Sequence, residues 1–544
     1  MKNAISVIAM ILAAAGFAAG PEGAGKTYYL DAARGNDAAS GLGPDKAWRS
    51  LERANRQAFK SGDRLLLGRG GRFKGTLVLS VAASAEAPFI VAAADTGGSD
   101  RLPIIDAAGC ESGVRIQNSR HVVVEDLEIT ADAGAVQAAP ARLGRHGVLI
   151  TTDAAGDFGQ ICVRRLNIHD IFATEERRDE GSRPTSNQGE GITVTVTAGS
   201  MTGVRIEECR IARTGRTGIN LNGRNDGRDF FLQDIVILKN SLEDIGGPGM
   251  NPKRCRQVVV RGNSVTRSGS SVDPRMHARG SGIWPWTCED VLIEQNRFMH
   301  ARGKADSCGA HIDYGCRDVI VQYNLSIDNE GGFVEILGDN FNCAYRYNIS
   351  INDGFRVKGK NGATQEGKVL WTSGYVGGRP RSGPVNSYIY NNTIYVKEGS
   401  RSCFSIGPTT RGLLIANNIF FLQGETLHVV GDQDKRKENA ITSVPGAVVT
   451  HNLFLSATVL PEGVPFANVD PCFGDPGFRN PGGLAAEDYI PHKRSLVQDQ
   501  GIEIPLIPGD STGLKGGLAV PHDILGRAIA GRPDLGAIEV ASPP

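Results

Sequence analysis

The chain has 544 residues, and its 59 lysine and arginine residues are balanced by 59 aspartate and glutamate residues. This balance leaves no global charge that would attract nucleic acid or a membrane surface. The 70 glycines and 26 prolines lack the triplet period of collagen, and with 40% hydrophobic residues the chain is not disordered. Composition therefore favours a globular fold of many short strands and turns.

Residues 1–24 have the features of a signal peptide. Lys2 supplies a positive start, an apolar stretch runs from Ile5 to Phe17, and small residues follow at 18–20. The apolar stretch is shorter than the roughly 20 residues that a membrane-spanning helix needs. We therefore expect a periplasmic or secreted protein with no membrane span after the signal is removed.

The centre of the sequence contains an internal repeat. Segments that begin at Cys255, Cys288 and Cys316 read CRQVVVRGN, CEDVLIEQN and CRDVIVQYN, with Asn eight positions after each Cys. Asparagine recurs once per repeat at Asn240, Asn263, Asn296, Asn324 and Asn348, and in NNTIY at Asn391 and NNIFF at Asn417. Short strands separated by Gly- and Asn-rich turns are typical of a parallel β-helix, in which like residues stack. This pattern predicts an asparagine ladder and a buried cysteine ladder, and no zinc site.

The two ends of the sequence carry a family resemblance. YYLDAARGNDAASGLGPDKAWRSLERAN, followed by SGDRLLLGRGGRF, resembles the N-terminal cap of right-handed β-helix proteins in the pectate-lyase-like superfamily. DPCFGDPGF, SLVQDQG and PDLGAIE resemble the closing segment of the same proteins, and VIVQYNLSIDNEGGF resembles their middle. The resemblance implies an all-β, right-handed parallel β-helix that acts on carbohydrate, but it does not fix the reaction. We assign residues 25–110 to the cap and first coils, 111–455 to the β-helix core and 456–544 to the closing segment.

A cluster of carboxylates follows from stacking the repeats. When their cysteines are aligned, the segments GMNPKRC, GIWPWTC and AHIDYGC match position by position. GFVEILG of the next coil has no cysteine and is aligned by its first glycine. This alignment places Asp313 beside Glu335 on the solvent face, with His311 two residues before Asp313 and Asp306 at the turn that enters the strand. Two carboxylates on strands about 4.8 Å apart repel, so one holds a proton near neutral pH. We therefore predict Asp313 and Glu335 as acid and base or nucleophile of a glycoside hydrolase, with Asp306 as a further carboxylate and His311 as a tuning neighbour.

Basic and aromatic residues surround this cluster in the sequence. Arginine forks pair with carboxylates and sulfates, so we expect uronic-acid-containing or sulfated sugars. The predicted basic contacts are Lys253, Arg254, Arg275, His277 and Arg279, of which the last three belong to an insertion that lengthens one coil. Trp284, Trp286 and Tyr314 offer flat faces to sugar rings, although the same pattern also suits tryptophans packed in the core.

Two other functions stay open at this point. In a polysaccharide lyase, a basic residue of the same set abstracts a proton beside a uronate carboxylate, and the acidic cluster holds calcium. The sequence carries no clear lyase signature. In a noncatalytic carbohydrate-binding solenoid, the acids are surface residues and the tryptophans bind sugar. We assign no metal ligands and no cofactor, a polysaccharide or oligosaccharide as partner, and a monomer, because capped ends block end-to-end stacking.

Overall fold

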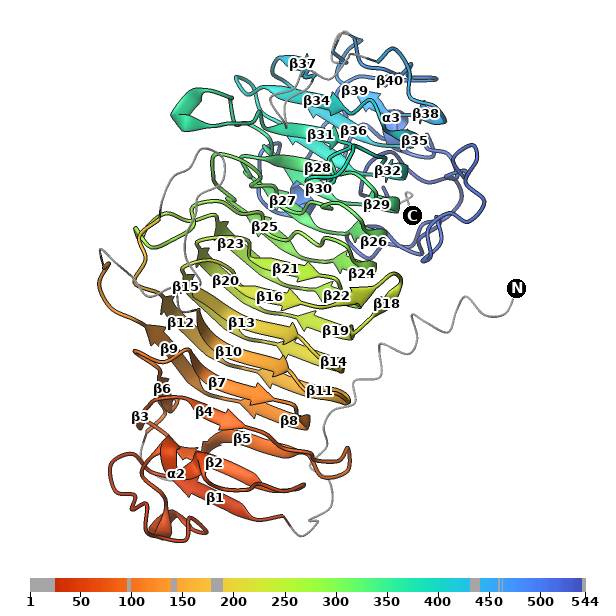
Figure 1. Cartoon of the computed structure of the whole chain (residues 1–544). Helices are drawn as coiled ribbons and strands as arrows, with labels where there is room; N and C mark the ends of the chain where they lie inside the picture. Colours follow the sequence, from red (N-terminus) through yellow and green to blue (C-terminus); the bar gives the residue numbers. More distant parts are fainter. Residues whose placement is uncertain are drawn as a thin grey trace.

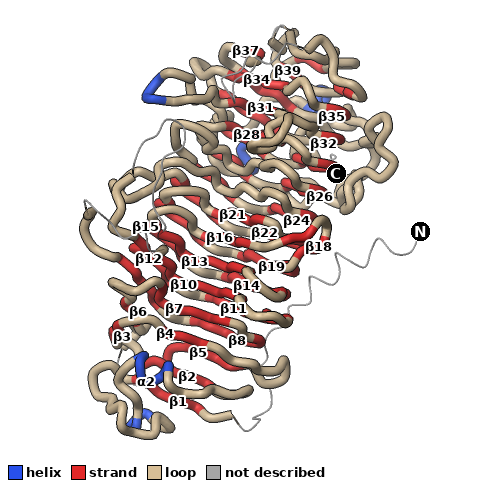
Figure 2. The backbone as a smooth tube through the Cα atoms, viewed as in Figure 1, coloured by secondary structure: helices blue, strands red, loops and turns tan. Residues whose placement is uncertain are grey.

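The computed structural model describes residues 25–94, 99–137, 144–177, 189–430, 441–457, 460–461 and 463–540, so the expected signal peptide lies outside it. In these ranges the chain winds into stacked coils that run in chain order from β1 to β40 (Figure 1). Strands and connecting loops dominate, and helices are few and short (Figure 2). The structure confirms the predicted parallel β-solenoid. No helix in the described ranges is long and apolar enough to cross a membrane.

Parallel strands of successive coils form three sheets, which we call the first, second and third sheet. The first sheet contains β1 (Thr27–Leu30), β2 (Arg64–Gly68), β5 (Phe89–Ala94), β8 (Arg120–Glu125), β11 (Asp157–Arg164), β14 (Ser200–Glu207), β19 (Leu232–Leu238), β22 (Arg256–Arg261), β24 (Glu289–Glu294), β26 (Arg317–Gln322), β29 (Phe341–Arg346), β32 (Val385–Tyr390), β35 (Arg411–Ala416) and β38 (Ala447–Thr450). The second sheet contains β3 (Arg72–Lys74), β6 (Ile104–Asp106), β9 (Glu128–Asp132), β12 (Asn167–Phe172), β15 (Arg210–Thr214), β20 (Ser241–Ile245), β23 (Ser264–Ser268), β25 (Arg297–Met299), β27 (Leu325–Ile327), β30 (Ile349–Ile351), β33 (Thr393–Val396), β36 (Ile419–Leu422), β39 (Leu453–Phe454) and β40 (Cys472–Phe473).

The third sheet is divided into two stretches. The first stretch contains β4 (Leu77–Leu79), β7 (Ser112–Gln117), β10 (Arg145–Thr152), β13 (Gly189–Val196), β16 (Ile219–Asn222) and β21 (Met250–Lys253), and the second contains β28 (Gly332–Ile336), β31 (Lys368–Thr372), β34 (Ser402–Ile406) and β37 (Thr426–His428). Between β21 and β28 two coils keep only single bridges, among them Ile283 to Ala310 and Ile312 to Ile336. Outside the sheets lie η1 (Pro44–Lys46), α2 (Leu51–Asn55), the β17 (Asn225–Asp226) and β18 (Asp229–Phe230) hairpin, η2 (Lys360–Gly362), η3 (Ala486–Tyr489) and α3 (Arg494–Val497).

Ladders of like residues hold the coils in register. The side-chain Nδ2 of Asn296 donates to Oδ1 of Asn324 at 3.0 Å and to the carbonyl oxygen of Val260 at 2.9 Å, and Asn263 donates to Asn296 in the same way. Each amide thereby pairs with the coil above and the coil below, which satisfies polar groups that the turn would otherwise bury unpaired. The predicted asparagine ladder is confirmed from Asn240 to Asn348, and it continues through Asn392 and Asn418, the second asparagine of NNTIY and of NNIFF. Cys255, Cys288 and Cys316 form the predicted buried column of free thiols.

Glycines form a further ladder where the chain enters the third sheet. A Cβ built on Gly218 would meet the carbonyl oxygen of Gly249 at 2.6 Å, and one on Gly249 would meet that of Gly282 at 2.5 Å. Real Cβ atoms do not approach backbone so closely, so only glycine permits the sharp bend at this corner. The corner therefore fixes where each strand of the third sheet begins, and with it which side chains face outward.

The C-terminal segment covers two of the three outer faces. Ile507 and Leu514 pack on Tyr388, Tyr390 and other residues of the first sheet, and Tyr489, Val497, Leu535 and Ile538 pack on the second sheet. Figure 1 shows this segment in blue beside β26, β32 and β35. Among the described residues, the C-terminal segment packs on the first and second sheets and not on the outer face of the third.

Candidate functional site

The predicted acids meet on the outer face of the third sheet, at its irregular centre. Hydrogen bonds from the His311 amide to the Ile283 carbonyl and from the Ile312 amide to the Glu335 carbonyl set the register. By this register His311 lies between Trp284 and Glu335, and Asp313 lies between Trp286 and Leu337. The predicted pairing of Asp313 with Glu335 is therefore wrong by two residues, although Ile312, Val334 and Ile336 fill the core as expected.

The expectation that this cluster faces solvent is also wrong. His311 and Glu335 each retain only 2% of their accessible surface, whereas Asp313 is half-buried. The chain between β30 and β31 folds back on the loop that precedes His311, with the Thr364 amide donating to the Lys304 carbonyl at 2.8 Å. A strand pattern shows which face a residue takes, but not whether a distant loop covers that face.

Glu335 belongs to a hydrogen-bonded network beneath the surface. The Cys308 thiol donates to Glu335 Oε2 at 3.0 Å, and His311 Nδ1 lies 3.9 Å from the same oxygen. His311 Nδ1 is also 2.9 Å from the hydroxyl of Ser281, which in turn accepts from the Cys308 amide at 3.0 Å. This network fixes the two side chains in one arrangement and leaves Glu335 with little access to a substrate.

Asp306 is held in a strained and strongly constrained position. Its φ is 51° and that of Ser307 is 70°, so two consecutive non-glycine residues occupy the left-handed region. The carboxylate forms an ion pair with Arg279, and the carbonyl oxygen accepts from Arg356 Nη1 at 2.9 Å. Left-handed residues are frequent at the corners of this solenoid, so here the conformation shows how the Asp306 side chain is directed and does not by itself mark a functional position.

Asp313 has an environment that favours the protonated acid. The pKa of Asp313 is raised to about 6, chiefly by burial and to a smaller extent by Asp306 and Glu335, while His311 and a hydrogen bond from the Tyr314 amide oppose the shift. The amide of Tyr314 donates to Asp313 Oδ1 at 2.8 Å. Asp313 and Asp306 therefore differ in environment: one carboxyl group holds a proton close to neutral pH, and the other is paired with an arginine.

Aromatic rings border Asp313, and only some of them are accessible. The ring centroid of Trp286 lies 5.6 Å from that of Tyr314, which is 6.2 Å from Tyr375. The guanidinium of the predicted contact Arg254 lies 4.6 Å from the Trp286 centroid. Trp284 packs on His311 at 5.1 Å and is half-buried like Trp286. Both tryptophans lie on the outer face, so the alternative placement in the core is wrong.

The basic insertion is built into the scaffold more than the sequence analysis expected. Arg275 retains 11% side-chain exposure and pairs with Asp132 and Asp273, and its guanidinium lies over Phe172. The His277 amide donates to the Gly215 carbonyl, so the insertion folds back across earlier coils. Of the predicted basic contacts, Arg279 reaches the acid cluster through Asp306, while Lys253 lies on β21, two coils before Asp313.

One cluster in the described ranges has the composition of a metal site. Ligand atoms of Cys308, His311 and Glu335 lie within 4.8 Å of one another, and all three residues are buried. Arg356 lies in the same interior, where its positive charge interacts with the Glu335 carboxylate, while burial keeps the Cys308 thiol protonated by raising its pKa. A buried guanidinium beside these ligands opposes a second cation, and the S–H to carboxylate hydrogen bond satisfies the cluster as it stands.

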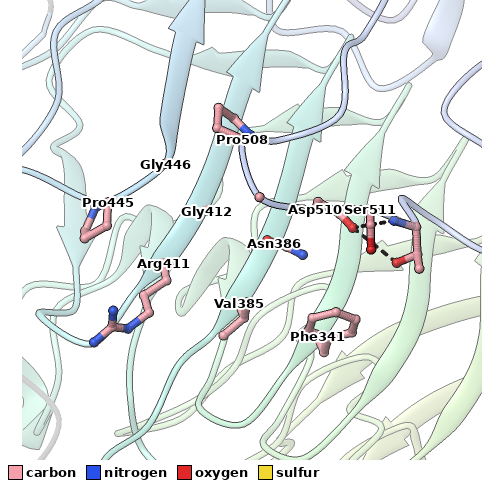
Figure 3. Close-up of a pocket in the computed structure, with 12 residues that line it drawn as sticks. Phe341, Val385, Asn386, Arg411, Gly412, Pro445, Gly446, Pro508, Asp510 and Ser511 are labelled. Atoms are coloured by element: carbon pink, nitrogen blue, oxygen red, sulfur yellow. Dashed lines mark hydrogen bonds between the residues drawn. The ribbon is translucent and has the colours of Figure 1, made fainter.

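A separate groove of about 390 Å³ lies on the first sheet (Figure 3). It is bordered by the starts of β32 and β35 and by residues 508–512 of the C-terminal segment. Its acid, Asp510, accepts hydrogen bonds from Tyr388 and from the amides of Thr512 and Gly513. These bonds attach the C-terminal segment to the first sheet. The groove is therefore the junction between the two, and it is separate from the carboxylate cluster on the third sheet.

Sequence reasoning missed several residues of this site. Cys308 and Ser281 complete the network around Glu335. They occupy matching positions of two successive coils, one residue before Gly309 and Gly282. Arg356 donates to the carbonyl oxygens of Gln365 and Gly303 as well as Asp306. Trp371, which pairs with Glu335 in the next strand, was detectable by extending the stack by one coil.

Residues 104–434 match the family described as the right-handed β-helix region. The chain belongs to the right-handed β-helix family. This match confirms the predicted handedness and the resemblance in fold. This chain is also distantly related to a lacto-N-biosidase from Bifidobacterium longum subsp. longum. The two sequences are 23% identical over 623 aligned positions, which include 95% of this chain. The alignment includes 36% of that relative, so the chain spans about a third of its length.

Solved structures show the same fold. The crystal structure of a GH136 lacto-N-biosidase from Eubacterium ramulus superposes with a TM-score of 0.51 and 22% identity, covering 74% of this chain and 67% of that one. XylC in complex with xylose superposes with a TM-score of 0.52 and 11% identity, covering 95% of this chain and 98% of that one. At these identities the structural matches establish the β-helix, and the chemistry has to be argued from the site.

Proposed function

We propose that the protein is an exported glycoside hydrolase that cleaves a glycosidic bond of an oligosaccharide or polysaccharide. The observation that carries the proposal is the pair Asp306 and Asp313, two carboxyl groups held on one face in environments that differ in charge and burial. Glycosidases need this division, because one carboxylic acid protonates the leaving oxygen and one carboxylate acts as nucleophile or activates water. The distant relationship to a lacto-N-biosidase supports the same reaction class.

Asp313 is the general acid in this proposal. A pKa of about 6 keeps a large fraction of Asp313 protonated at mildly acidic pH and about a tenth of it at pH 7, whereas an ordinary exposed aspartate is ionised at both. When the glycosidic bond breaks, the proton passes from the Asp313 carboxyl group to the leaving oxygen. The neighbouring carboxylates, Asp306 and Glu335, maintain this acid by electrostatic repulsion of its ionised form.

Asp306 is the ionised partner, and Glu335 has a positioning role. Arg279 neutralises and orients the Asp306 carboxylate, and Arg356 clamps its backbone, so that the anion faces the developing positive charge of the sugar ring. Glu335 is too enclosed to touch a sugar; it holds His311 and Cys308 in place. This assignment differs from the sequence-based prediction, in which Asp313 and Glu335 form the pair.

The aromatic border supplies the binding surface. Trp286 and Tyr314 stand beside Asp313 with neighbouring rings 5.6 Å apart, and apolar ring faces stack on the C–H faces of sugars. Trp286 is half-buried with the Arg254 guanidinium over its ring, so a sugar stacks on the part of the indole that Arg254 leaves exposed.

Incubation of the purified protein with neutral, uronic and sulfated oligosaccharides tests the proposal. The panel includes an aryl lacto-N-bioside, because the distant relatives are lacto-N-biosidases. We expect new reducing ends or released aryl alcohol without the ultraviolet absorbance of unsaturated uronates. Absorbance together with reducing ends would establish a lyase instead, and binding without any product would establish a noncatalytic solenoid.

A further inference from the structure

A second groove lies on the outer face of the third sheet, in the coils that precede the acid cluster. It has a volume of about 370 Å³ and is lined by side chains of β7, β10, β13, β16 and β21. Glu190, Thr193, Asn220 and Lys253 form its floor, and Arg216 stands on its border. The floor is polar although it is buried, which is uncommon for a sheet surface unless the polar groups serve a ligand.

Hydrogen bonds fix this floor around Glu190. Asn220 Nδ2 donates to both oxygens of Glu190 at 2.8 Å, and the Thr193 hydroxyl donates to Glu190 Oε2 at 2.7 Å. Thr193 Oγ1 also lies 2.8 Å from His146 Nδ1. Burial raises the pKa of Glu190, but His146 and the bonds from Asn220 and Thr193 outweigh burial, so the net shift is downward. Glu190 is therefore a fixed anion.

The groove holds more positive charge than this anion balances. Arg115 pairs with Glu111 at 3.1 Å, which cancels both charges at one end. Burial lowers the pKa of His146, so this ring is neutral near pH 7. The side chains of Lys253 and Arg216 form no hydrogen bond or ion pair in the described part of the chain, and Glu190 is the carboxylate whose charge acts on Lys253. One positive charge is left over at the groove.

Two observations indicate that a ligand completes the groove. Asn220 retains 4% exposure, yet its side-chain Oδ1 has no hydrogen-bond partner among the described residues. Burial lowers the pKa of Lys253 to about 8, which shows that its ammonium group lacks solvation and that Glu190 compensates only in part. A buried acceptor and an under-solvated cation in one groove cost free energy unless a polar molecule pairs with them.

We propose that this groove, which we call the Lys253 groove, is a subsite that binds an anionic substituent, a carboxylate or sulfate, of the sugar chain cleaved at Asp306 and Asp313. Lys253 and Arg216 pair with the anion, and Asn220 Oδ1 accepts from a sugar hydroxyl. The inference rests on the proposed hydrolase function. It moves anion recognition from the insertion arginines, which pair with scaffold acids, to the strands of the third sheet.

The position of the groove suits a substrate that reaches the acids. Lys253 aligns with Trp286 in the next coil, and Trp286 aligns with Asp313 in the coil after that. With parallel strands about 4.8 Å apart, the Lys253 and Asp313 backbones are about 10 Å apart along the solenoid. The ring face of Trp286 stands between them, so an oligosaccharide lying along the solenoid axis contacts all three in turn.

Matched pairs of ligands test the anion subsite directly. Isothermal titration calorimetry with the Asp306→Asn protein compares oligogalacturonides with their methyl esters, and κ-carrageenan oligosaccharides with their desulfated forms. The first pair reports on carboxylates and the second on sulfates. We expect the anionic member of at least one pair to bind about tenfold more tightly, the contribution of one charge-assisted hydrogen bond.

Substitutions then locate the effect. Lys253→Met and Arg216→Met, each added to Asp306→Asn, are expected to abolish the preference for the anion and leave binding of the neutral member unchanged. Lys239→Met is the matched control, because Lys239 is exposed at the corner between β19 and β20, away from the third sheet. Absence of any anion preference, or equal losses for both members of a pair, would overturn the proposal. If the wild-type protein releases no sugar from any substrate, the hydrolase function is refuted. If it still prefers the anionic ligand and Lys253→Met removes that preference, the anion site is supported independently.

Discussion

The third sheet differs sharply between its regular N-terminal stretch and its irregular centre. From β7 to β21 the strands pair residue by residue, whereas the coils around Ile283 and Ile312 keep single bridges. The regular stretch carries the Lys253 groove, whose side chains are spaced by the sheet itself. The centre carries the strained Asp306 and the half-buried Asp313. Regular strand pairing produces an even surface that suits ligand recognition. Where the pairing is interrupted, single side chains take the individual positions that acid–base chemistry requires.

The largest stability effect is expected in the regular ladder. Asn296→Ala removes bonds to the Asn263 and Asn324 side chains and to the Val260 carbonyl, and leaves several buried groups unpaired. We expect a loss of about 2 to 4 kcal/mol, measured as the shift of the urea unfolding midpoint. Asn225→Ala is the control, because its bond to the Gly227 carbonyl lies in an exposed hairpin. A midpoint unchanged by Asn296→Ala would contradict a structural role for the ladder.

Asp313→Asn is expected to stabilise the protein while it removes the acid. Asp313 has a pKa of about 6 in the folded protein against an ordinary 3.8, so the folded state binds more protons between these values and stability falls as pH rises through them. At pH 7 the variant should gain about 1 to 3 kcal/mol, and at pH 3.5 the difference should vanish. Chemical denaturation at both pH values measures this; a gain that persists at pH 3.5 would have another cause.

A smaller effect is expected at the aromatic border. Trp286→Ala removes the ring between the Lys253 groove and Asp313, and should raise KM by about three- to tenfold with a lesser change in kcat. Trp48→Phe, in the N-terminal cap far from the third-sheet centre, serves as a control for general loss of packing. A fall confined to kcat would mean that Trp286 acts on the reacting bond and not on binding.

No effect is expected from chelation. Arg356 already brings a positive charge to Cys308 and Glu335, so hydrolysis should be unchanged after dialysis against EDTA. Loss of activity on chelation, restored by zinc, would make Cys308, His311 and Glu335 metal ligands. Loss restored by calcium would favour the lyase alternative.

Much of the fold was predictable from the sequence because its ladders repeat in it. The Cys–Asn spacing aligned Val258, Val291 and Val319, which the first sheet pairs as expected. The site was predictable in part: His311 and Asp313 share one face, and Asp306 lies close enough to raise the pKa of Asp313. The register between His311 and Glu335 was not predictable, because no cysteine marks the coil of Glu335. The alignment placed Ala310 opposite Gly332, whereas the structure places Cys308 there, two residues earlier. Burial of Glu335 depends on loops that return from distant positions, and no strand pattern records them.

The same limit explains why the Lys253 groove escaped the sequence analysis. GINLN at Gly218 and GMNPK at Gly249 are aligned repeats, and their asparagines share one column with Trp284. Extending the stack toward the N-terminus would have brought Asn220 and Thr193 together. The unpaired state of Lys253 and Arg216 could not be inferred, because it depends on which acids the folded chain places nearby.

The most direct test of the account compares four proteins in one assay: the wild type, Asp306→Asn, Asp313→Asn and Glu335→Gln, on any substrate that the wild type cleaves. We expect Asp306→Asn and Asp313→Asn each to lower kcat/KM by about 10² to 10⁴ with the fold intact by circular dichroism, and Glu335→Gln to lose much less. Full activity in either aspartate variant, or a larger loss in Glu335→Gln than in both, would contradict the assignment of Asp306 and Asp313 as the catalytic pair.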